Sequence, residues 1–142
     1  MKSENSYGII PFYKNNDEIK VFLIHQISRT GDLIWTFAKG REENGESPTD
    51  TAVREVYEET GLRPKIQNEE KTYSLEYEFV FEEAVIKKST TYFAGIVESP
   101  TFTIQEKEVK EAGWFTIDKA LEKLTYGEYK DILNKAVSDL DF

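Results

Sequence analysis

The sequence predicts one α+β domain, in which a mixed β-sheet is covered by helices on both faces. Its 142 residues are the length of one ordinary domain. Hydrophobic residues make up 39% of the chain and aromatic residues 13%, which is enough to bury a core. Strand-like and helix-like segments follow in the order β-β-β-α-β-β-β-α, with no repeat or linker. We therefore expect a single domain over 1–142, with residues 1–5 flexible.

Six strands are expected from β-branched and aromatic residues that alternate with polar ones or form short apolar runs. They span residues 6–13, 19–27, 33–37, 72–81, 89–97 and 112–117. The Asn-Asn-Asp segment at 15–17 predicts a hairpin between the first two strands. Pro11 predicts that the first strand is an edge strand or carries a bulge, since proline cannot donate a ladder hydrogen bond. A polar loop over 40–45 is expected after the third strand.

Helix signals bracket one segment in the middle of the chain and occur again near its end. Ser47 is a candidate N-cap, Pro48 a favoured first helical residue and Gly61 a candidate C-cap. The apolar residues between them recur at helical spacing, which predicts that one face of this helix packs on the sheet. Asp118 is expected to cap a short helix, and residues 126–140 form a second helical stretch.

Charge and composition exclude several classes of protein. The net charge of −9 repels duplex nucleic acid and anionic membranes. No apolar run approaches the ~20 residues that span a bilayer, and residues 1–5 lack the apolar stretch of a signal peptide. The absence of Cys excludes a disulfide framework, a thiolate zinc site and a catalytic thiol. We expect a cytoplasmic protein that binds no DNA and no membrane.

One predicted helix concentrates acidic residues. At about 100° per residue, Glu55, Glu58 and Glu59 fall within an arc of roughly 100°. Three carboxylates on one helical face repel one another unless cations lie between them. Arg54 could orient one of these carboxylates through its planar guanidinium. Glu46 lies in the loop before the helix, from which it can turn back toward the same face.

The chemistry of these carboxylates indicates a metal-dependent reaction at phosphate. All-oxygen ligands select the hard cations Mg²⁺ or Mn²⁺ over zinc or copper. Such cations bridge to phosphate oxygens, neutralise charge that develops on a phosphoryl group and lower the pKa of bound water. The pattern therefore predicts a Mg²⁺ or Mn²⁺ cofactor and a phosphorylated small molecule as substrate, even in an acidic protein.

The residues around this helix resemble the signature of the Nudix hydrolases. That signature reads G-x5-E-x7-R-E-U-x-E-E-x-G-U, where U is a bulky aliphatic residue, and every fixed position is matched. The matching residues are Gly40, Glu46, Arg54, Glu55, Val56, Glu58, Glu59, Gly61 and Leu62. A chance match is on the order of one in a million from background residue frequencies. The resemblance implies an α/β/α sandwich that hydrolyses a nucleoside diphosphate linked to another moiety.

The resemblance also implies roles for individual residues. The implied metal ligands are Gly40, through its carbonyl, together with Glu55, Glu58 and Glu59. Arg54 and Glu46 would orient these ligands. Residues 105–108 and Trp114 resemble the family's late acidic loop and the strand that follows it. Position relative to Trp114 favours Glu108, over Glu106 and Glu111, as an extra metal ligand or general base. Either Glu58 or Glu108 would accept the proton of the attacking water.

Two further segments resemble the dinucleoside (diadenosine) polyphosphate hydrolase branch of the family. Residues 35–40 are similar to the W-x-x-P-K-G approach of those enzymes, with Ala38 where they commonly carry Pro. Lys39 would meet a phosphate chain as a point charge. Residues 87–95 are similar to the strand that supplies a base-stacking Tyr in that branch. The implied substrate-binding residues are Tyr92 for stacking, Lys87 for phosphate, and Tyr77 or Phe79 as a second aromatic.

The leading hypothesis is a metal-dependent Nudix pyrophosphohydrolase that acts on a dinucleoside polyphosphate such as diadenosine tetraphosphate, as a monomer or homodimer. Alternative substrates are modified nucleoside triphosphates, capped RNA and diphosphoinositols, the last two disfavoured by the net charge. ADP-ribose is a lesser option, because residues 73–81 contain no supporting Pro. An alternative of another class is a non-catalytic Nudix-fold nucleotide sensor, but such modules usually lose carboxylates of the signature and none is missing here. A purely structural domain would not need Arg54 and the full signature.

Overall fold

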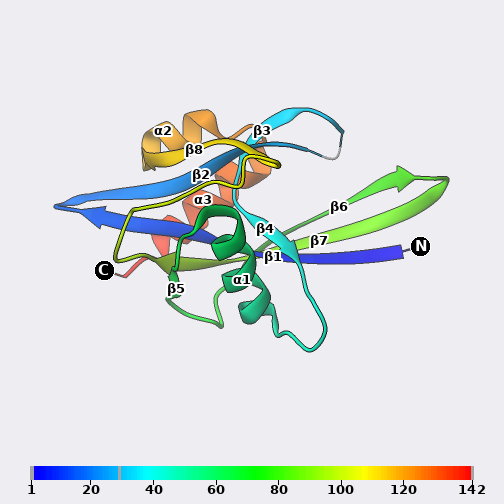
Figure 1. Cartoon of the computed structure of the whole chain (residues 1–142), viewed down its shortest axis with the longest axis horizontal. Helices are drawn as coiled ribbons and strands as arrows, with labels where there is room; N and C mark the ends of the chain where they lie inside the picture. Colours follow the sequence, from blue (N-terminus) through cyan, green and yellow to red (C-terminus); the bar gives the residue numbers. More distant parts are fainter. Residues whose placement is uncertain (1, 29, 142) are drawn as a thin grey trace.

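The computed structural model describes residues 2–28 and 30–141, which form an eight-stranded mixed sheet with helices on both faces (Figure 1). The strands are β1 (Lys2–Asn15), β2 (Glu18–Ile27), β3 (Leu33–Thr36), β4 (Lys39–Arg41), β5 (Lys65–Ile66), β6 (Tyr73–Phe81), β7 (Ala84–Ile96) and β8 (Val109–Thr116). The helices are α1 (Pro48–Thr60), α2 (Ile117–Lys123) and α3 (Gly127–Ser138). The predicted α+β class is confirmed.

The two faces of the sheet bury separate apolar clusters. On one face, Ala52 and Val56 of α1 pack in a cluster with Phe93 of β7. On the other face, α2 and α3 cover a second cluster, in which Leu133 of α3 packs with Tyr92 of β7. Because successive side chains of a strand point to opposite faces, neighbouring residues of β7 serve different clusters. This arrangement is the sandwich of helix, sheet and helix that the sequence predicts.

The central strand β1 changes partner on one of its edges. It pairs in parallel with β7 from Lys2 to Phe12, and on its other edge it pairs antiparallel with β4 over 6–8 and with β2 over 12–15. The prediction that Pro11 marks an edge strand or a bulge is therefore wrong. The Phe12 carbonyl accepts a hydrogen bond from Val97 beyond β7. The nitrogen of Pro11 thus faces the other edge, in the gap between β4 and β2, where its missing N–H interrupts no ladder.

The ends of α1 lie where the sequence places them. The Ser47 side chain accepts a hydrogen bond from the Asp50 backbone, Pro48 is the first helical residue, and Gly61 closes the helix at a φ of 73°. The prediction for α2 is wrong by two residues, because Thr116 rather than Asp118 caps it by accepting from the Lys119 backbone. Within the described part of the chain, no helix is both long and apolar enough to cross a membrane.

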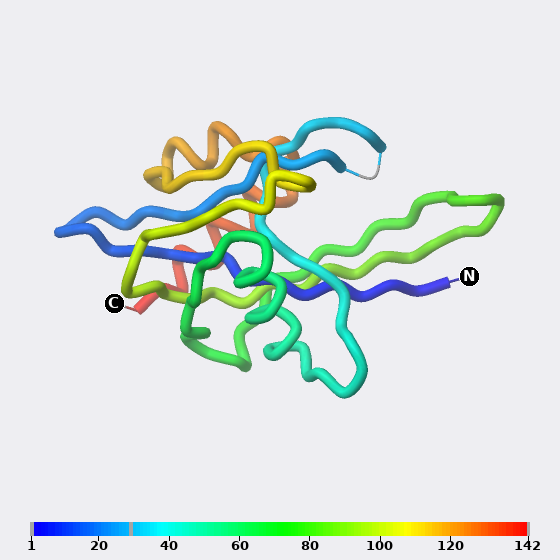
Figure 2. Tube along the Cα trace, in the orientation of Figure 1, coloured from blue at the N-terminus to red at the C-terminus, as the bar shows by residue number. Residues whose placement is uncertain are grey.

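A three-stranded arm extends from the body of the molecule (Figures 1 and 2). It is made of β6, most of β7 and the N-terminal part of β1, so residues 2–5, expected to be flexible, belong to a strand. Tyr77 of β6 pairs with Lys88 of β7, which pairs with Glu4 of β1. These three side chains therefore share one face of the arm.

Candidate active site

Arg54 is the centre of a hydrogen-bond network that joins α1 to the segment before it. Its Nε and Nη2 donate to the two carboxylate oxygens of Glu46 at 2.7 and 2.9 Å. Its Nη1 donates to Glu55 at 2.9 Å and to Glu58 at 3.2 Å, and Nη2 also donates to the Arg41 carbonyl at 2.9 Å. One guanidinium thus orients three carboxylates and holds the end of β4 against the helix.

Glu46 remains ionised and anchors this network. One of its carboxylate oxygens accepts from the Glu43 backbone at 2.8 Å and from the Thr51 hydroxyl at 3.1 Å. Hydrogen bonding to Arg54, followed by that to Glu43, lowers the pKa of Glu46 to about 2. The same bond to Glu46 raises the pKa of Arg54 further. Glu46 thus turns toward the helix, as expected, and the structure adds that it does so by pairing with Arg54.

Gly40 allows β4 to approach α1 closely. A Cβ added at Gly40 would overlap the carboxylate of Glu55. Burial raises the pKa of Glu55, and the charges of Glu58 and Glu108 raise it further, while the hydrogen bond from Arg54 opposes this rise. The structure thus brings together Gly40 and Glu55, which were expected to share a metal.

Glu59 is the most deeply buried carboxylate of the set, at 7% exposure. Within the described residues its Oε2 has no hydrogen-bond partner. Burial raises the pKa of Glu59 to about 8, and the charges of Glu55, Glu108 and Glu58 add to the rise while Lys39 opposes it. A buried, unpartnered oxygen under the negative charge of three other carboxylates is a setting that a bound cation would stabilise.

The donor set fits a hard divalent cation, although the carboxylates are held apart. In residues 2–28 and 30–141, no three acidic or histidine side chains lie close enough together to form a ready cation-binding group. Arg54 occupies oxygens of Glu55 and Glu58, and Glu59 keeps an oxygen free of hydrogen bonds among the described residues. The oxygens are of the kind that Mg²⁺ and Mn²⁺ prefer. A cation would remove the repulsion between the carboxylates and allow them to draw together.

Glu108 of the late acidic loop is electrostatically coupled to the carboxylates of α1. The charge of Glu108 raises the pKa of both Glu55 and Glu59. Glu111 lies elsewhere, since it pairs with His25 across β8 and β2, 3.8 Å from the ring nitrogen. This electrostatic coupling favours Glu108 over Glu111, and the role of Glu108 in catalysis remains a prediction.

The predicted substrate-binding residues are divided between two faces of the sheet. Lys39 lies close enough to Glu59 to lower the pKa of that carboxylate, and it pairs with β1 on the same face of the sheet as Tyr77. Tyr77 is 43% exposed and available to a ligand. Lys87 lies on the opposite face of the arm, where it pairs with Glu76 at 3.8 Å. The structure thus places Lys87 on the opposite face of the sheet from Lys39 and Tyr77, and its role in phosphate binding remains a prediction.

The prediction that Tyr92 stacks on a base is also corrected, because Tyr92 is fully buried. Its ring packs edge-on against Phe37 and Tyr129, with centroids 5.6 and 6.3 Å away. Burial raises the pKa of the Tyr92 hydroxyl, which has no well-formed hydrogen bond within the described residues. The alternation of β7 points this ring into the core under α3, so it is a packing residue.

Arg41 is a residue of this region that sequence reasoning missed. Its Nη1 lies 3.5 Å from a carboxylate oxygen of Glu4, and its side chain is 66% exposed. In the structure β4 places Arg41 on the same side as Lys39, but a strand of three residues is too short for this alternation to be visible in the sequence.

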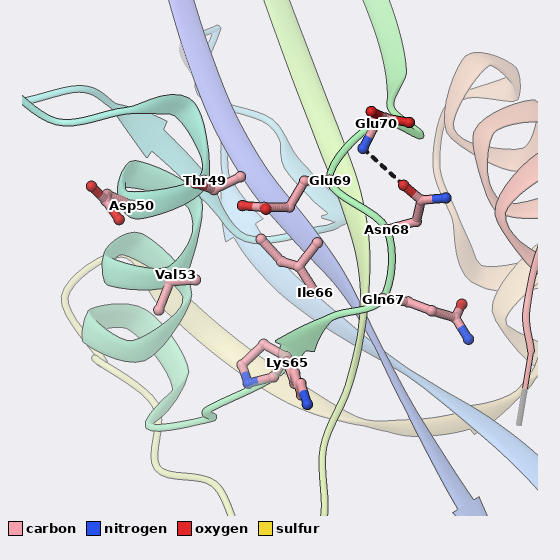
Figure 3. A pocket seen from close by; sticks show the side chains of 10 residues that line it. Thr49, Asp50, Val53, Lys65, Ile66, Gln67, Asn68, Glu69 and Glu70 are labelled. Atoms are coloured by element: carbon pink, nitrogen blue, oxygen red, sulfur yellow. Dashed lines mark hydrogen bonds between the residues drawn. The ribbon is translucent and has the colours of Figure 1, made fainter.

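A surface hollow of about 630 Å³ lies beside α1 (Figure 3). It is lined from the helix by Thr49, Asp50 and Val53, and from the following segment by residues 64–70. These helix residues turn away from Glu55 and Glu59, so the hollow is separate from the carboxylate site.

Comparison with known proteins finds one family across the chain. The family model for the NUDIX domain matches residues 2–135. The mutator protein MutT4 of Mycobacterium tuberculosis is 29% identical over 119 residues, which are 84% of this chain and 47% of that protein. Nudix hydrolase 16, mitochondrial, of Arabidopsis thaliana is 32% identical over 139 residues, which are 89% of this chain and 75% of that protein. This chain thus spans about half the length of the first relative and three quarters of the second.

Solved structures show the same fold at low sequence identity. The C. elegans Ap4A hydrolase is 22% identical with a TM-score of 0.77, over 99% of this chain and 100% of that one. The NUDIX domain of Shewanella oneidensis NrtR, complexed with ADP ribose, is 15% identical with a TM-score of 0.79, over 99% and 90% of the two chains. At these identities the likeness concerns the fold alone.

Proposed function

Because the chain belongs to the NUDIX domain family, we propose that it is a metal-dependent pyrophosphohydrolase whose substrate is a dinucleoside polyphosphate such as diadenosine tetraphosphate. The observation that carries the proposal is the arrangement around Arg54, which orients Glu55 and Glu58 on the same helix as the buried Glu59. An acidic helix face that is merely solvated would not need a guanidinium that fixes three carboxylates. Nor would it need Gly40, whose lack of a side chain lets the Glu55 carboxylate contact β4.

Each group of the site has a task in such a reaction. The candidate metal ligands are Glu55, Glu58, Glu59 and the Gly40 carbonyl. When bound, a divalent cation neutralises charge on the phosphoryl group and acidifies a water molecule. Arg54 keeps the carboxylates oriented, and it is itself fixed by the ionised Glu46.

The chemical step is attack of water on one phosphorus of the chain, with cleavage of the bridging P–O bond. The bridging oxygen stays on the neighbouring phosphorus, and the second product leaves with it as a terminal phosphate. Glu58 or Glu108 would take the proton of the water, and Lys39 would hold the negative charge of the phosphate chain.

The dinucleoside substrate is supported by three features. The charge of Lys39 lowers the pKa of Glu59, and Tyr77 is exposed on the same face of the sheet as Lys39. The fold is similar to that of the C. elegans Ap4A hydrolase. An exposed aromatic ring can stack on a base, whichever base it is.

A turnover panel with Mg²⁺ tests this proposal. The panel includes diadenosine tetraphosphate, nucleoside triphosphates, ADP-ribose, capped RNA and a diphosphoinositol. We expect diadenosine tetraphosphate to have the highest kcat/KM, and Glu58→Gln and Glu59→Gln each to lower kcat by about 10²-fold or more. Glu122→Gln, at an exposed position of α2, is the matched control and should leave turnover unchanged. Unchanged turnover in chelator would exclude the metal mechanism, and binding without turnover would identify a nucleotide sensor.

A further inference from the structure

The short strand β4 carries different chemistry on its two sides. Gly40 turns toward α1, where it contacts Glu55. Lys39 and Arg41 lie on the other side, because alternate residues of a strand face opposite ways. Their partners in β1 are Gly8 and Ser6, which place both cations on the face of the sheet that carries Tyr77. Two cationic side chains therefore flank Gly40 in β4 and lie on the side of the strand away from α1.

Arg41 is held in place by a buried carboxylate. Glu4 is only 8% exposed, and its oxygen lies 3.5 Å from the guanidinium of Arg41. In the neighbouring strand, Glu4 is paired in register with Lys88, which is also buried. Because a buried carboxylate is costly without cations beside it, these residues form a matched set. Two thirds of the Arg41 side chain remains exposed, so its guanidinium can also meet a ligand from solvent.

These residues form a row across four strands. Tyr77 of β6 is followed by Lys88 of β7 and Glu4 of β1, and Arg41 of β4 contacts Glu4. Adjacent strands are about 4.8 Å apart, so Tyr77 lies roughly 14 Å from β4. The Arg41 carbonyl accepts a hydrogen bond from Nη2 of Arg54 at 2.9 Å, so Arg41 adjoins the carboxylate site. A ligand that reaches from the carboxylates past β4 to Tyr77 would therefore meet Arg41.

We propose that Arg41 is a second phosphate-binding residue, positioned by Glu4, which holds the phosphates of a long polyphosphate chain beyond those at the carboxylates. The planar guanidinium can bind two oxygens of one phosphate, and its attachment to Glu4 reduces the freedom lost on binding. This inference rests on the proposed function and deepens it, because it makes phosphate-chain length the property that the site selects.

Binding of inorganic tripolyphosphate tests the inference without any turnover. The affinity is measured by calorimetry, in Mg²⁺ and again in chelator, for the wild type, Arg41→Gln and Arg63→Gln. We expect Arg41→Gln to weaken binding roughly 10-fold or more, as is typical for loss of a charge-assisted hydrogen bond. Arg63→Gln is the matched control, since its guanidinium packs on the ring of Tyr57, 4.4 Å from the centroid. It should bind like the wild type.

Two further measurements define the roles. For diadenosine tetraphosphate, Arg41→Gln should raise KM with little change in kcat, and the effect should be smaller for ADP-ribose, which has two phosphates. Glu4→Gln should weaken tripolyphosphate binding in the wild type but add no further loss in the Arg41→Gln background, because Glu4 acts through Arg41. A merely structural role of Glu4 would instead give an independent loss in both backgrounds.

The outcomes separate this inference from the proposed function. Equal tripolyphosphate affinity in Arg41→Gln and Arg63→Gln, in both buffers, overturns the inference even if the enzyme is active. Arg41-dependent binding without hydrolysis of any nucleotide supports the inference as a phosphate site and refutes the proposed function.

Discussion

Substitution of Tyr92 distinguishes a packing residue from a ligand-binding one. Tyr92 lies in the core with Phe37 and Tyr129 around it, and its hydroxyl is buried without a well-formed hydrogen bond among the described residues. Tyr92→Phe keeps the ring and removes only that hydroxyl. Tyr92→Ala removes the ring and leaves a cavity in the core.

The structure predicts opposite effects of the two substitutions on the free energy of unfolding. A buried polar group without a partner costs about 1–3 kcal/mol, so Tyr92→Phe should increase stability by an amount of that order. Deleting a large buried aromatic side chain costs about 3–5 kcal/mol, so Tyr92→Ala should decrease it correspondingly. Neither change removes a group that touches substrate. The KM for diadenosine tetraphosphate should therefore stay near the wild-type value in Tyr92→Phe.

Urea unfolding at 25 °C measures both changes, with equal slopes required for a two-state comparison. Tyr57→Phe is the control for an exposed tyrosine and should change stability by less than about 0.5 kcal/mol. A loss of more than about 1 kcal/mol in Tyr92→Phe would refute the reasoning, because it would mean that the hydroxyl is bonded in solution. If Tyr92→Ala were as stable as the wild type and had a raised KM, the result would show that Tyr92 stacks on a base after all.

Three other substitutions test the carboxylate site. Gly40→Ala should displace the Glu55 carboxylate and lower kcat at least 10-fold in a Mg²⁺ assay, with circular dichroism unchanged. Without metal, Glu59 holds its proton in the folded state up to pH about 8, against an ordinary value of 4.5. Since the folded state binds the extra proton, stability should fall as pH rises through this window, and urea unfolding of Glu59→Gln in chelator should lack that slope. Glu108→Gln should lower kcat more than KM; a larger effect of Glu106→Gln would show that the wrong carboxylate was chosen.

The central helix and its chemistry were predictable because their signals are local. The cap at Ser47, the proline after it and the left-handed Gly61 are short-range requirements of any helix end, and the structure confirms them. The relation of Arg54 to Glu58 follows from helical spacing. The predicted hairpin of β1 and β2 also depends on adjacent residues.

The features that the sequence did not predict depend on contacts between distant segments. The strands β4 and β5 contain three and two residues, too few for alternation to be visible, and they are strands only because β1 and β7 provide partners. The face on which Tyr92 lies depends on register with a strand from the other end of the chain. Resemblance identified the type of residue on that strand, but it could not show that this ring points into the core.

The parallel pairing of β1 with β7 has a consequence for how the protein folds. Residues 2–12 find this partner only in residues 86–96, so a long loop must close before the arm and the centre of the sheet can form. During synthesis, β1 and β2 can pair early. The apolar residues of β1 that pack with β7 stay without that partner until β7 has been synthesised. Non-local pairing of this kind slows folding. Glu4 is in register with Lys88 of β7, so the burial of this carboxylate also depends on the late pairing.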